Sequence, residues 1–520
     1  SGKSLQKFLA LKDQLPSVKH IVVFREAVPP ALKSMHGDFI LNFEQFLARA
    51  NHATDDSVAL RGDNVLVEHA ATILYTSGTL GEPKGCVLSH DNLSYVAHAS
   101  LISHLQEQTM PTLIAFGQIG ESASVILNII LPMLFVCHRR TSFTICITKP
   151  TSSVALGNSL RDAKPTLIAA PVPVLVDLAA ELAAAPKSEG DAKLAAWAAK
   201  VSLDASKNRQ DLADIAAIKG VGMAQQVNER IRATLGLDRC SHVLGLGPVP
   251  LAICEQLAQS GIDVLECYGT TECSGFASMS TPFHYRFGTS GIRLGGTDIK
   301  IDFNEGLPQR KEGEILVSGR NVMLGYIGNE QLTRRVLDKD GWLRTGDIGK
   351  VDEMNLLTVT GRVKELFTTL TGERISPAVI ESELKRQCPV LSNVVVVGDR
   401  RKYVVALVTL KCKKNPETGA WTDDLAPEAL HVNPDVLTVT TARRDKKWLD
   451  YIAQVVSVYN SQAPSPLHKV RRFCILSSDI STEEMTPTKK IKRQLVTDRC
   501  INIIEKLYAE DSPRSSVTKQ

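Results

Sequence analysis

Short strands rich in β-branched residues alternate with Ala-rich helical stretches through the first half of this chain, and this alternation limits its fold more than any other feature. The expected strands are HIVVF at 20–24, ATILYT at 71–76, PTLIAA at 165–170 and GIDVLECY at 261–268. Helices are expected at 175–184 and 191–201. Strands of this length separated by helices are typical of βαβ units, so we predict an α/β fold with a mainly parallel sheet.

The pattern changes after Gly288. The strings TDIKID, GEILVSG and NLLTVTG occupy 297–302, 313–319 and 355–361. Each alternates apolar with polar residues between turns, which is typical of a small antiparallel β subdomain.

A second α/β unit is expected after Gly361, with NVVVVGD and KYVVALVTLK as strands. The polar, Pro-containing segment 412–435 is expected to be a surface excursion. We therefore predict a large N-terminal domain at 1–360, a smaller α+β C-terminal domain at 361–510 and a disordered tail at 511–520.

Composition excludes several classes of protein. Lys and Arg number 60 against 56 Asp and Glu, a net charge of +4, so a nucleic-acid partner bound mainly through phosphates is not expected. The 11 cysteines form no CxxC pair and no cluster with zinc spacing, which indicates a reducing compartment. The most apolar run, 124–137, is shorter than the ~18 residues of a membrane span and is interpreted as core.

The string YTSGTLGEPKG directly follows the strand expected at 71–76. Its glycines and hydroxyls are suited to wrapping phosphate oxygens, and its lysine adds a positive charge. It is not a Walker A loop, because Lys84 is followed by Gly85. Taken alone, it fits a purely structural turn equally well. The candidate phosphate ligands are Thr76, Ser77, Gly78, Thr79, Gly81 and Lys84.

Two further strings place acidic residues in turns. In ECYGTTECSG the hydroxyl of Thr271 precedes the carboxylate of Glu272, a pair that can hold a phosphate oxygen and Mg²⁺ together. Taken alone, the string is better explained as an ordinary turn at the end of a strand. In GWLRTGDIG the carboxylate of Asp347 can accept two hydrogen bonds, which suits vicinal ribose hydroxyls. An Asp after Gly is otherwise an ordinary turn residue.

These strings occur in the order found in the adenylate-forming superfamily of acyl-CoA synthetases, luciferases and peptide-synthetase adenylation domains, which the chain resembles through almost its whole length. The stretch 391–430, GRVKE at 361–365 and the ending TPTKKIKR most resemble the bubblegum-type long-chain acyl-CoA synthetases. The resemblance implies a large N-terminal AMP-binding domain, shortened at its start, and a mobile C-terminal domain that turns about Gly361.

The resemblance also implies residue roles. Tyr268, with Gly269 and Thr270, lies at the adenine, and the GLGPVP turn with Gly245 and Gly247 lies on the adenine side. Thr271 contacts the α-phosphate and Glu272 ligates Mg²⁺. Asp347 and Arg362 hold the ribose. Lys490 reaches the α-phosphate and the substrate carboxylate, and Gly372 lets the backbone approach CoA closely.

The expected activity is that of an ATP- and Mg²⁺-dependent long-chain fatty acid–CoA ligase, with fatty acid, ATP and CoA as partners. A cytosolic location is expected, with or without loose attachment to an internal membrane. Leu80 stands where the family has Thr, and Phe116, Gly117 and Gln118 stand in place of its Leu-Ser-His. Two alternatives therefore stay open: a catalytically impaired relative that binds nucleotide or acyl chains, and an adenylating enzyme for another carboxylate.

Overall fold

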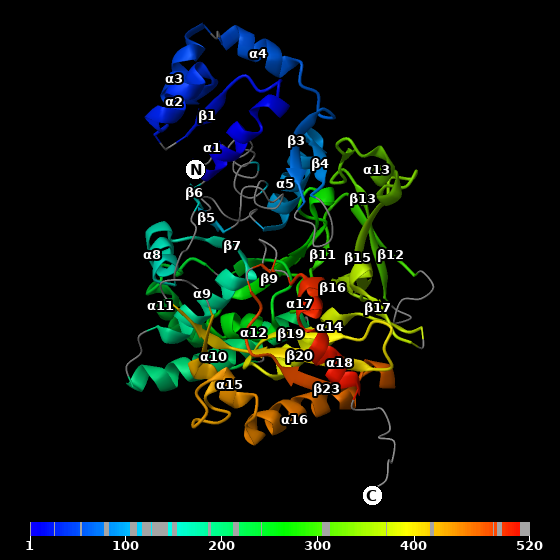
Figure 1. Ribbon diagram of the computed structural model, residues 1–520. Helices are drawn as coiled ribbons and strands as arrows, with labels where there is room; N and C mark the ends of the chain where they lie inside the picture. The colour runs from blue at the N-terminus through cyan, green and yellow to red at the C-terminus, as the bar shows by residue number, and fades with distance from the viewer. Residues whose placement is uncertain are drawn as a thin grey trace, which may run out of the picture. The chain divides into compact units, whose positions relative to one another are not determined.

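The computed structural model describes most of the chain (Figure 1). The described residues are 2–24, 27–52, 55–76, 83–104, 112–116, 126, 130, 144–147, 153–185, 189–211, 218–240, 242–303, 312–370, 372–415, 421–481, 483–485 and 491–509. The chain divides into two compact units, Ser1–His69 and Ala70–Gln520. The boundary expected at Gly361 falls inside the second unit and stays a prediction.

The first unit contains a parallel pair of strands, β1 (Ile21–Val23) and β2 (Ile40–Asn42). Its helices are α1 (Gly2–Ala10), α2 (Pro30–His36), α3 (Phe43–Ala48) and α4 (Asp55–Asp63). Helix α3 begins with a capping box in which Asn42 and Gln45 each accept the other's backbone N–H. The strand expected at 20–24 is present, but it pairs with β2 and not with the large sheet.

Among the described residues of the second unit, the largest sheet has seven strands in the order β11-β10-β9-β8-β7-β5-β6. Its strands are β5 (Thr112–Ala115), β6 (Thr144–Ile147), β7 (Leu167–Pro171), β8 (His242–Leu246), β9 (Asp263–Tyr268), β10 (Ser278–Met279) and β11 (Ile292–Arg293). Strands β5 to β9 are parallel, and β10 and β11 are antiparallel to their neighbours. The mainly parallel sheet is confirmed, with the strands expected at 165–170 and 261–268 as β7 and β9.

Both faces of this sheet are buried. Successive strand residues point to opposite faces, so Leu113 and Ile114 belong to two different hydrophobic clusters. Helix α9 buries a stripe at spacings of three and four residues, typical of one helix face: Leu175, Leu178, Ala179 and Leu182. The helices are α5 (His90–His104), α8 (Ser153–Ala163), α9 (Val172–Ala184), α10 (Glu189–Gln210), α11 (Val221–Ala233) and α12 (Leu251–Gln259). Both expected helices are present, and α10 is longer than predicted.

The strand expected at 71–76 was assigned to the wrong sheet. It is β3 (Ala70–Tyr75), which pairs antiparallel with β4 (Gly85–Ser89), and β4 pairs with β14 (Gly325–Tyr326). Two strands joined by so short a connection reverse direction and therefore pair antiparallel. The loop between β3 and β4 carries the expected phosphate ligands.

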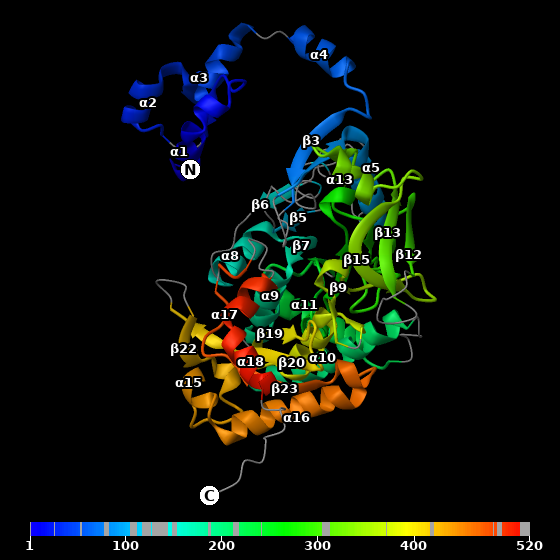
Figure 2. The same cartoon turned by 45° about the vertical axis from the view of Figure 1, so that its right-hand side comes forward.

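The antiparallel β subdomain is confirmed as a four-stranded sheet in the order β12-β13-β15-β16. Its strands are β12 (Thr297–Asp302), β13 (Gly313–Gly319), β15 (Leu343–Val351) and β16 (Leu357–Arg362), and α13 (Glu330–Val336) precedes β15. Asp347 and Arg362 are register partners across β15 and β16. Figure 2 shows β12, β13 and β15 as one layer.

The C-terminal part contains a three-stranded sheet in the order β19-β20-β23. Its elements are β17 (Phe367–Thr368), β18 (Arg374–Ile375), α14 (Pro377–Gln387), β19 (Leu391–Val397), β20 (Val404–Leu410), β21 (Cys412–Lys414), β22 (Trp421–Leu425), α15 (Val439–Ala442), α16 (Lys446–Gln462), β23 (Val470–Ile475), α17 (Arg493–Arg499) and α18 (Ile501–Ala509). Successive residues of β19 point to opposite faces of the sheet and so belong to different hydrophobic clusters. Val394 is in the cluster of Trp448 of α16, whereas Val395 is in the cluster of Val496 of α17. Helices α17 and α18 lie against this sheet in Figure 2.

The segment 412–435 was expected to be a surface excursion, and this prediction was wrong. It forms the β21–β22 hairpin, and Leu425 and Ala429 are buried in the same cluster as Trp448. The segment therefore contributes to the core through these residues, whereas Trp421, Asp423 and Asp424 are exposed. The tail expected to be disordered, 511–520, lies outside the described residues.

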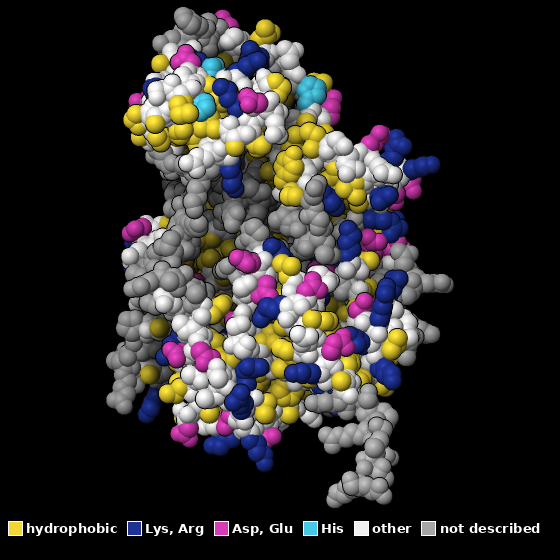
Figure 3. Space-filling model, viewed as in Figure 1, with side chains coloured by type: hydrophobic (Ala, Val, Ile, Leu, Met, Phe, Trp, Pro, Cys, Tyr) yellow, Lys and Arg dark blue, Asp and Glu magenta, His cyan; other side chains and the backbone are white. Residues whose placement is uncertain are grey.

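Charged side chains are spread over the surface. On the face drawn in Figure 3, Lys and Arg are interspersed with Asp and Glu instead of gathering in one large patch. Within the described ranges, the helices are too short or too polar to cross a bilayer.

Candidate nucleotide site

Three of the predicted ligands meet where β9 ends. The Tyr268 hydroxyl donates to Asp347 Oδ2 at 2.9 Å, and Arg362 Nε lies 2.9 Å from Asp347 Oδ1. Burial, followed by the charge of Asp347, raises the pKa of Tyr268 well above its ordinary value, so the phenol stays a donor. Because the β15–β16 register places Arg362 opposite Asp347, strand pairing alone brings the cation to the carboxylate.

The turn after Tyr268 leaves no space for larger residues. A Cβ on Gly269 would lie 2.2 Å from the Gly275 carbonyl oxygen, so this position requires glycine. The next residues form a short 3-10 helix, η6 (Thr271–Cys273), in which the Thr270 N–H donates to Cys273 Sγ at 3.0 Å. The turn therefore presents Thr271 and Glu272 from a rigid backbone.

Glu272 and Lys84 meet at one aromatic side chain. The Tyr326 hydroxyl donates to Glu272 Oε1 at 2.7 Å, and Lys84 Nζ lies 5.3 Å from the centre of the Tyr326 ring. The Thr76 N–H donates to the Lys84 carbonyl at 2.9 Å and closes the base of the loop between β3 and β4. The other predicted loop residues, Ser77, Gly78, Thr79 and Gly81, lie outside the described residues. Tyr326 was not predicted from the sequence, because its role depends on contacts with Glu272 and Lys84, which lie far from it in the chain.

The predicted adenine-side turn follows β8. Gly245 lies so close to Val249 that a Cβ would be 2.6 Å from Val249 Cγ2, and Gly247 has φ +114°, a conformation that favours glycine. Glu266 supports this turn, because its Oε2 accepts the Val249 N–H at 2.9 Å and its Oε1 accepts the Gly288 N–H at 2.8 Å. Burial raises the pKa of Glu266 to about 7. Glu266 was not predicted from the sequence; it lies in a strand in which every residue is buried.

Two predicted residues belong to the C-terminal part. Gly372 is exposed with φ +85°, and its loop is anchored by Glu373, whose Oε1 accepts from Ser465 Oγ at 2.9 Å and lies 3.2 Å from His468 Nδ1. Burial lowers the pKa of His468. Lys490 lies outside the described residues, as do Gly117 and Gln118.

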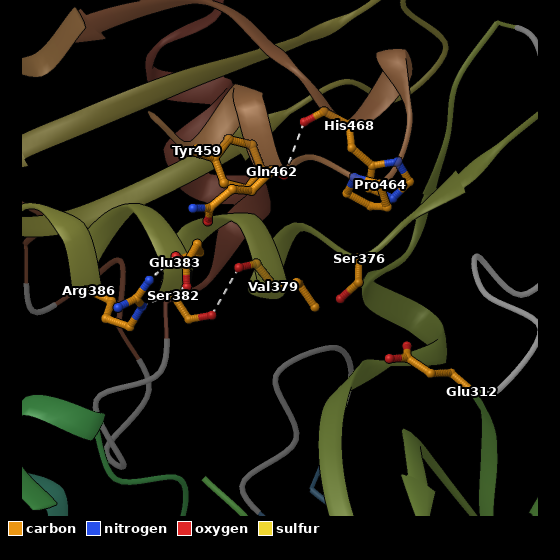
Figure 4. A pocket seen from close by; sticks show the side chains of 10 residues that line it. All are labelled: Glu312, Ser376, Val379, Ser382, Glu383, Arg386, Tyr459, Gln462, Pro464 and His468. Atoms are coloured by element: carbon orange, nitrogen blue, oxygen red, sulfur yellow. Dashed lines mark hydrogen bonds and ion pairs between the residues drawn. The ribbon is translucent and has the colours of Figure 1, made fainter. Parts of the chain in front are cut away.

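A cavity of about 540 Å³ lies elsewhere, and none of the predicted ligands lines it (Figure 4). Its polar walls bind one another: the Tyr459 hydroxyl donates to the His468 carbonyl, and Ser382 Oγ donates to the Val379 carbonyl. Glu383 pairs with Arg386 on the same helix. The cavity is therefore distinct from the Tyr268–Asp347–Arg362 cluster.

The residues present fit Mg²⁺ bound together with phosphates. Among the described residues, no group of three or more His, Cys, Asp and Glu could form an all-protein metal site. Mg²⁺ at phosphate sites is usually held by one or two carboxylates and the phosphate oxygens. Glu272 meets this requirement, because Tyr326 binds one carboxylate oxygen and no hydrogen bond from a described residue reaches the other.

Comparison with known proteins agrees with this geometry. The profile of the AMP-binding enzyme family matches residues 10–327, and that of the AMP-binding enzyme C-terminal domain matches 364–512. Long-chain-fatty-acid–CoA ligase ACSBG2 of Xenopus laevis is 30% identical over 98% of this chain and 69% of its own length. ACSBG2 of Rattus norvegicus is 31% identical over 98% and 77%.

Solved structures show the same fold. The anthranilate CoA ligase AuaEII in complex with anthranoyl-AMP has a TM-score of 0.64 at 18% identity, over 97% of this chain and 78% of that one. O-succinylbenzoate CoA synthetase MenE of Bacillus subtilis, in complex with ATP and a magnesium ion, has a TM-score of 0.61 at 18% identity, over 95% and 81%. The chain belongs to the AMP-binding enzyme family, among the bubblegum-type long-chain-fatty-acid–CoA ligases.

Proposed function

We propose that this chain is an acyl-CoA synthetase that joins a long-chain fatty acid to CoA at the expense of ATP. The observation that carries the proposal is the Tyr268–Asp347–Arg362 cluster beside Glu272, which suits a ribose and a phosphate chain. The names of the relatives supply the substrate class. When bound, Mg²⁺ would neutralise phosphate charge beside Glu272.

In the first half-reaction, a carboxylate oxygen of the fatty acid attacks the α-phosphorus of ATP. The bond to the β-phosphate breaks, which gives acyl-AMP and pyrophosphate. Asp347 accepts hydrogen bonds from the ribose hydroxyls, while the ion pair with Arg362 orients its carboxylate. Thr271 donates a hydrogen bond to the α-phosphate, and Lys490 neutralises charge there, where two anions meet. The departing phosphates are held by Thr76, Ser77, Gly78, Thr79, Gly81 and Lys84.

In the second half-reaction, the CoA thiol loses its proton and its sulfur attacks the acyl carbonyl, and AMP leaves. We assign the approach of CoA to the loop at Gly372, whose positive φ and open surroundings let a ligand come close to the backbone. Rotation about Gly361 would exchange Lys490 for this loop between the two steps.

The test is pyrophosphate release with fatty acids of increasing chain length, with and without CoA. The expected result is CoA-independent formation of acyl-AMP from palmitate, followed by acyl-CoA when CoA is added. Folded protein that binds ATP but activates no fatty acid would refute the substrate class.

Aryl and amino acids in the same panel identify an enzyme for another carboxylate. Replacement of Leu80 by Thr, with a gain in adenylation, identifies an impaired phosphate loop. Fractionation of cells tests the expected cytosolic or loosely membrane-attached location.

A further inference from the structure

The segment that includes β14 is bonded to both halves of the phosphate-binding region. The Met323 N–H donates to the Glu272 carbonyl at 2.9 Å and joins the turn after β9. The Ile327 N–H donates to the Gly85 carbonyl at 2.9 Å and joins the strand that follows the phosphate loop. One short stretch of backbone therefore sets the distance between the two halves.

Tyr326 lies within this stretch, and its side chain contacts the charged group of each half. Its hydroxyl donates to Glu272 Oε1 at 2.7 Å, and its ring faces Lys84 Nζ at 5.3 Å. The side chain is 7% exposed, so its own position is fixed by packing. A hydrogen bond to a charged group and a cation–π contact are both stronger where water is excluded.

We propose that Tyr326 is a positioning residue for the first half-reaction, which fixes the Glu272 carboxylate for Mg²⁺ and holds the Lys84 ammonium beside the phosphates. The inference rests on the proposed function, since both partners act on ATP. Tyr326 would act through Glu272 and Lys84, the two residues that its side chain contacts.

The physical reason is preorganisation. Glu and Lys side chains each lose conformational entropy when they bind a ligand, and a partner that already restricts them lowers this cost. With one oxygen of Glu272 bound to the hydroxyl, the second oxygen remains for the cation.

The test compares Tyr326→Phe, which removes only the hydroxyl, with Tyr326→Leu, which also removes the ring. Binding of ATP is measured by calorimetry in Mg²⁺ and in EDTA. Tyr326→Phe is expected to weaken binding in Mg²⁺ about tenfold, as for a lost hydrogen bond to a charged group, and to leave binding in EDTA within about twofold. Tyr326→Leu is expected to weaken binding in EDTA as well, by about threefold, because Lys84 loses its aromatic contact.

The matched control is Tyr459→Phe, which also removes a buried tyrosine hydroxyl, one that donates to the His468 carbonyl outside the site. It should bind ATP like the unmodified protein. Equal binding by Tyr326→Phe and the unmodified protein in Mg²⁺ overturns the proposal, as does an equal loss in Mg²⁺ and EDTA. If Tyr326→Leu does not fold, Tyr326→Phe alone decides. Because the readout is nucleotide binding, a failure to activate fatty acids refutes the proposed function without deciding the role of Tyr326.

Discussion

Glu266 joins two turns through a carboxylate that forms no ion pair with any of the described residues. Its oxygens accept the N–H groups of Val249 and Gly288, and its side chain is 3% exposed. The two backbone donors favour the ionised form, but burial outweighs them and raises the pKa to about 7. The neighbouring thiols of Cys254 and Cys267 stay neutral, because burial raises their pKa as well.

This raised pKa predicts a pH dependence of folding. Between the ordinary pKa of 4.5 and about 7, the folded protein keeps a proton that the unfolded chain has lost. The stability from this group is complete below about pH 4.5 and falls as the pH rises to about 7, by on the order of 3 kcal/mol. Glu266→Gln, which cannot ionise, should remove this part of the slope in urea unfolding followed from pH 5 to 8. The exposed Glu353→Gln is the control, and an identical slope in both variants would contradict the assignment.

Asp347 predicts an effect on nucleotide affinity. Asp347→Asn removes the charge that holds Arg362 and weakens the expected ribose hydrogen bonds, so AMP affinity should fall roughly tenfold or more. Calorimetry with AMP measures it. The exposed Asp298 of the same sheet, which pairs with Arg293, is the control, and Asp298→Asn should leave AMP affinity unchanged. Equal losses in the two variants would contradict the ribose assignment.

At the scale of the element, alternation of apolar and polar residues predicted strands well and their partners poorly. β12, β13 and β16 were expected from their pattern, and they pair as an antiparallel subdomain. β3 was expected as a strand from its β-branched run, yet it pairs with β4 in a different sheet. Local sequence reports which residues are buried, whereas pairing depends on segments distant in the chain.

The loop at Gly372 carries a prediction about the second half-reaction. Ser465→Ala removes the hydroxyl that donates to Glu373 and that contacts His468 at 3.0 Å, so the loop should lose its anchor. Acyl-CoA formation should slow several-fold while acyl-AMP formation stays unchanged, measured by single-turnover assays of each step. Ser461→Ala, which changes an exposed serine in the last turn of α16, is the control. Equal slowing of both half-reactions would contradict a role confined to CoA.

At the scale of the whole molecule, motifs predicted the residues expected to bind the nucleotide more completely than the residues that hold them in place. Tyr268, Asp347 and Arg362 were expected together and lie in contact. Glu266 and Tyr326 were not expected, because each acts through packing between segments far apart in sequence, and no local pattern reports such contacts. The separate first unit, Ser1–His69, was likewise not foreseen within the domain predicted at 1–360.

The division into two units predicts that residues 70–520 fold without the first unit. The buried residues of the five hydrophobic clusters all lie after residue 70. The shortened protein should unfold cooperatively and bind AMP within about threefold of the full chain, since the cores set stability. Circular dichroism and calorimetry measure both properties. A shortened protein without a cooperative transition would contradict this independence.

The pairing of β4 with β14 has a consequence for synthesis of the chain on the ribosome. Gly325 lies opposite Val87. The strand after the phosphate loop therefore cannot form this pairing until more than two hundred further residues have been synthesised. Contacts of such long separation form late, and the exposed edge of β4 is open to wrong pairing until then. A nascent chain therefore gains its phosphate site only after β14 has emerged, and a stalled or truncated product that ends before Gly325 lacks a complete site to bind ATP.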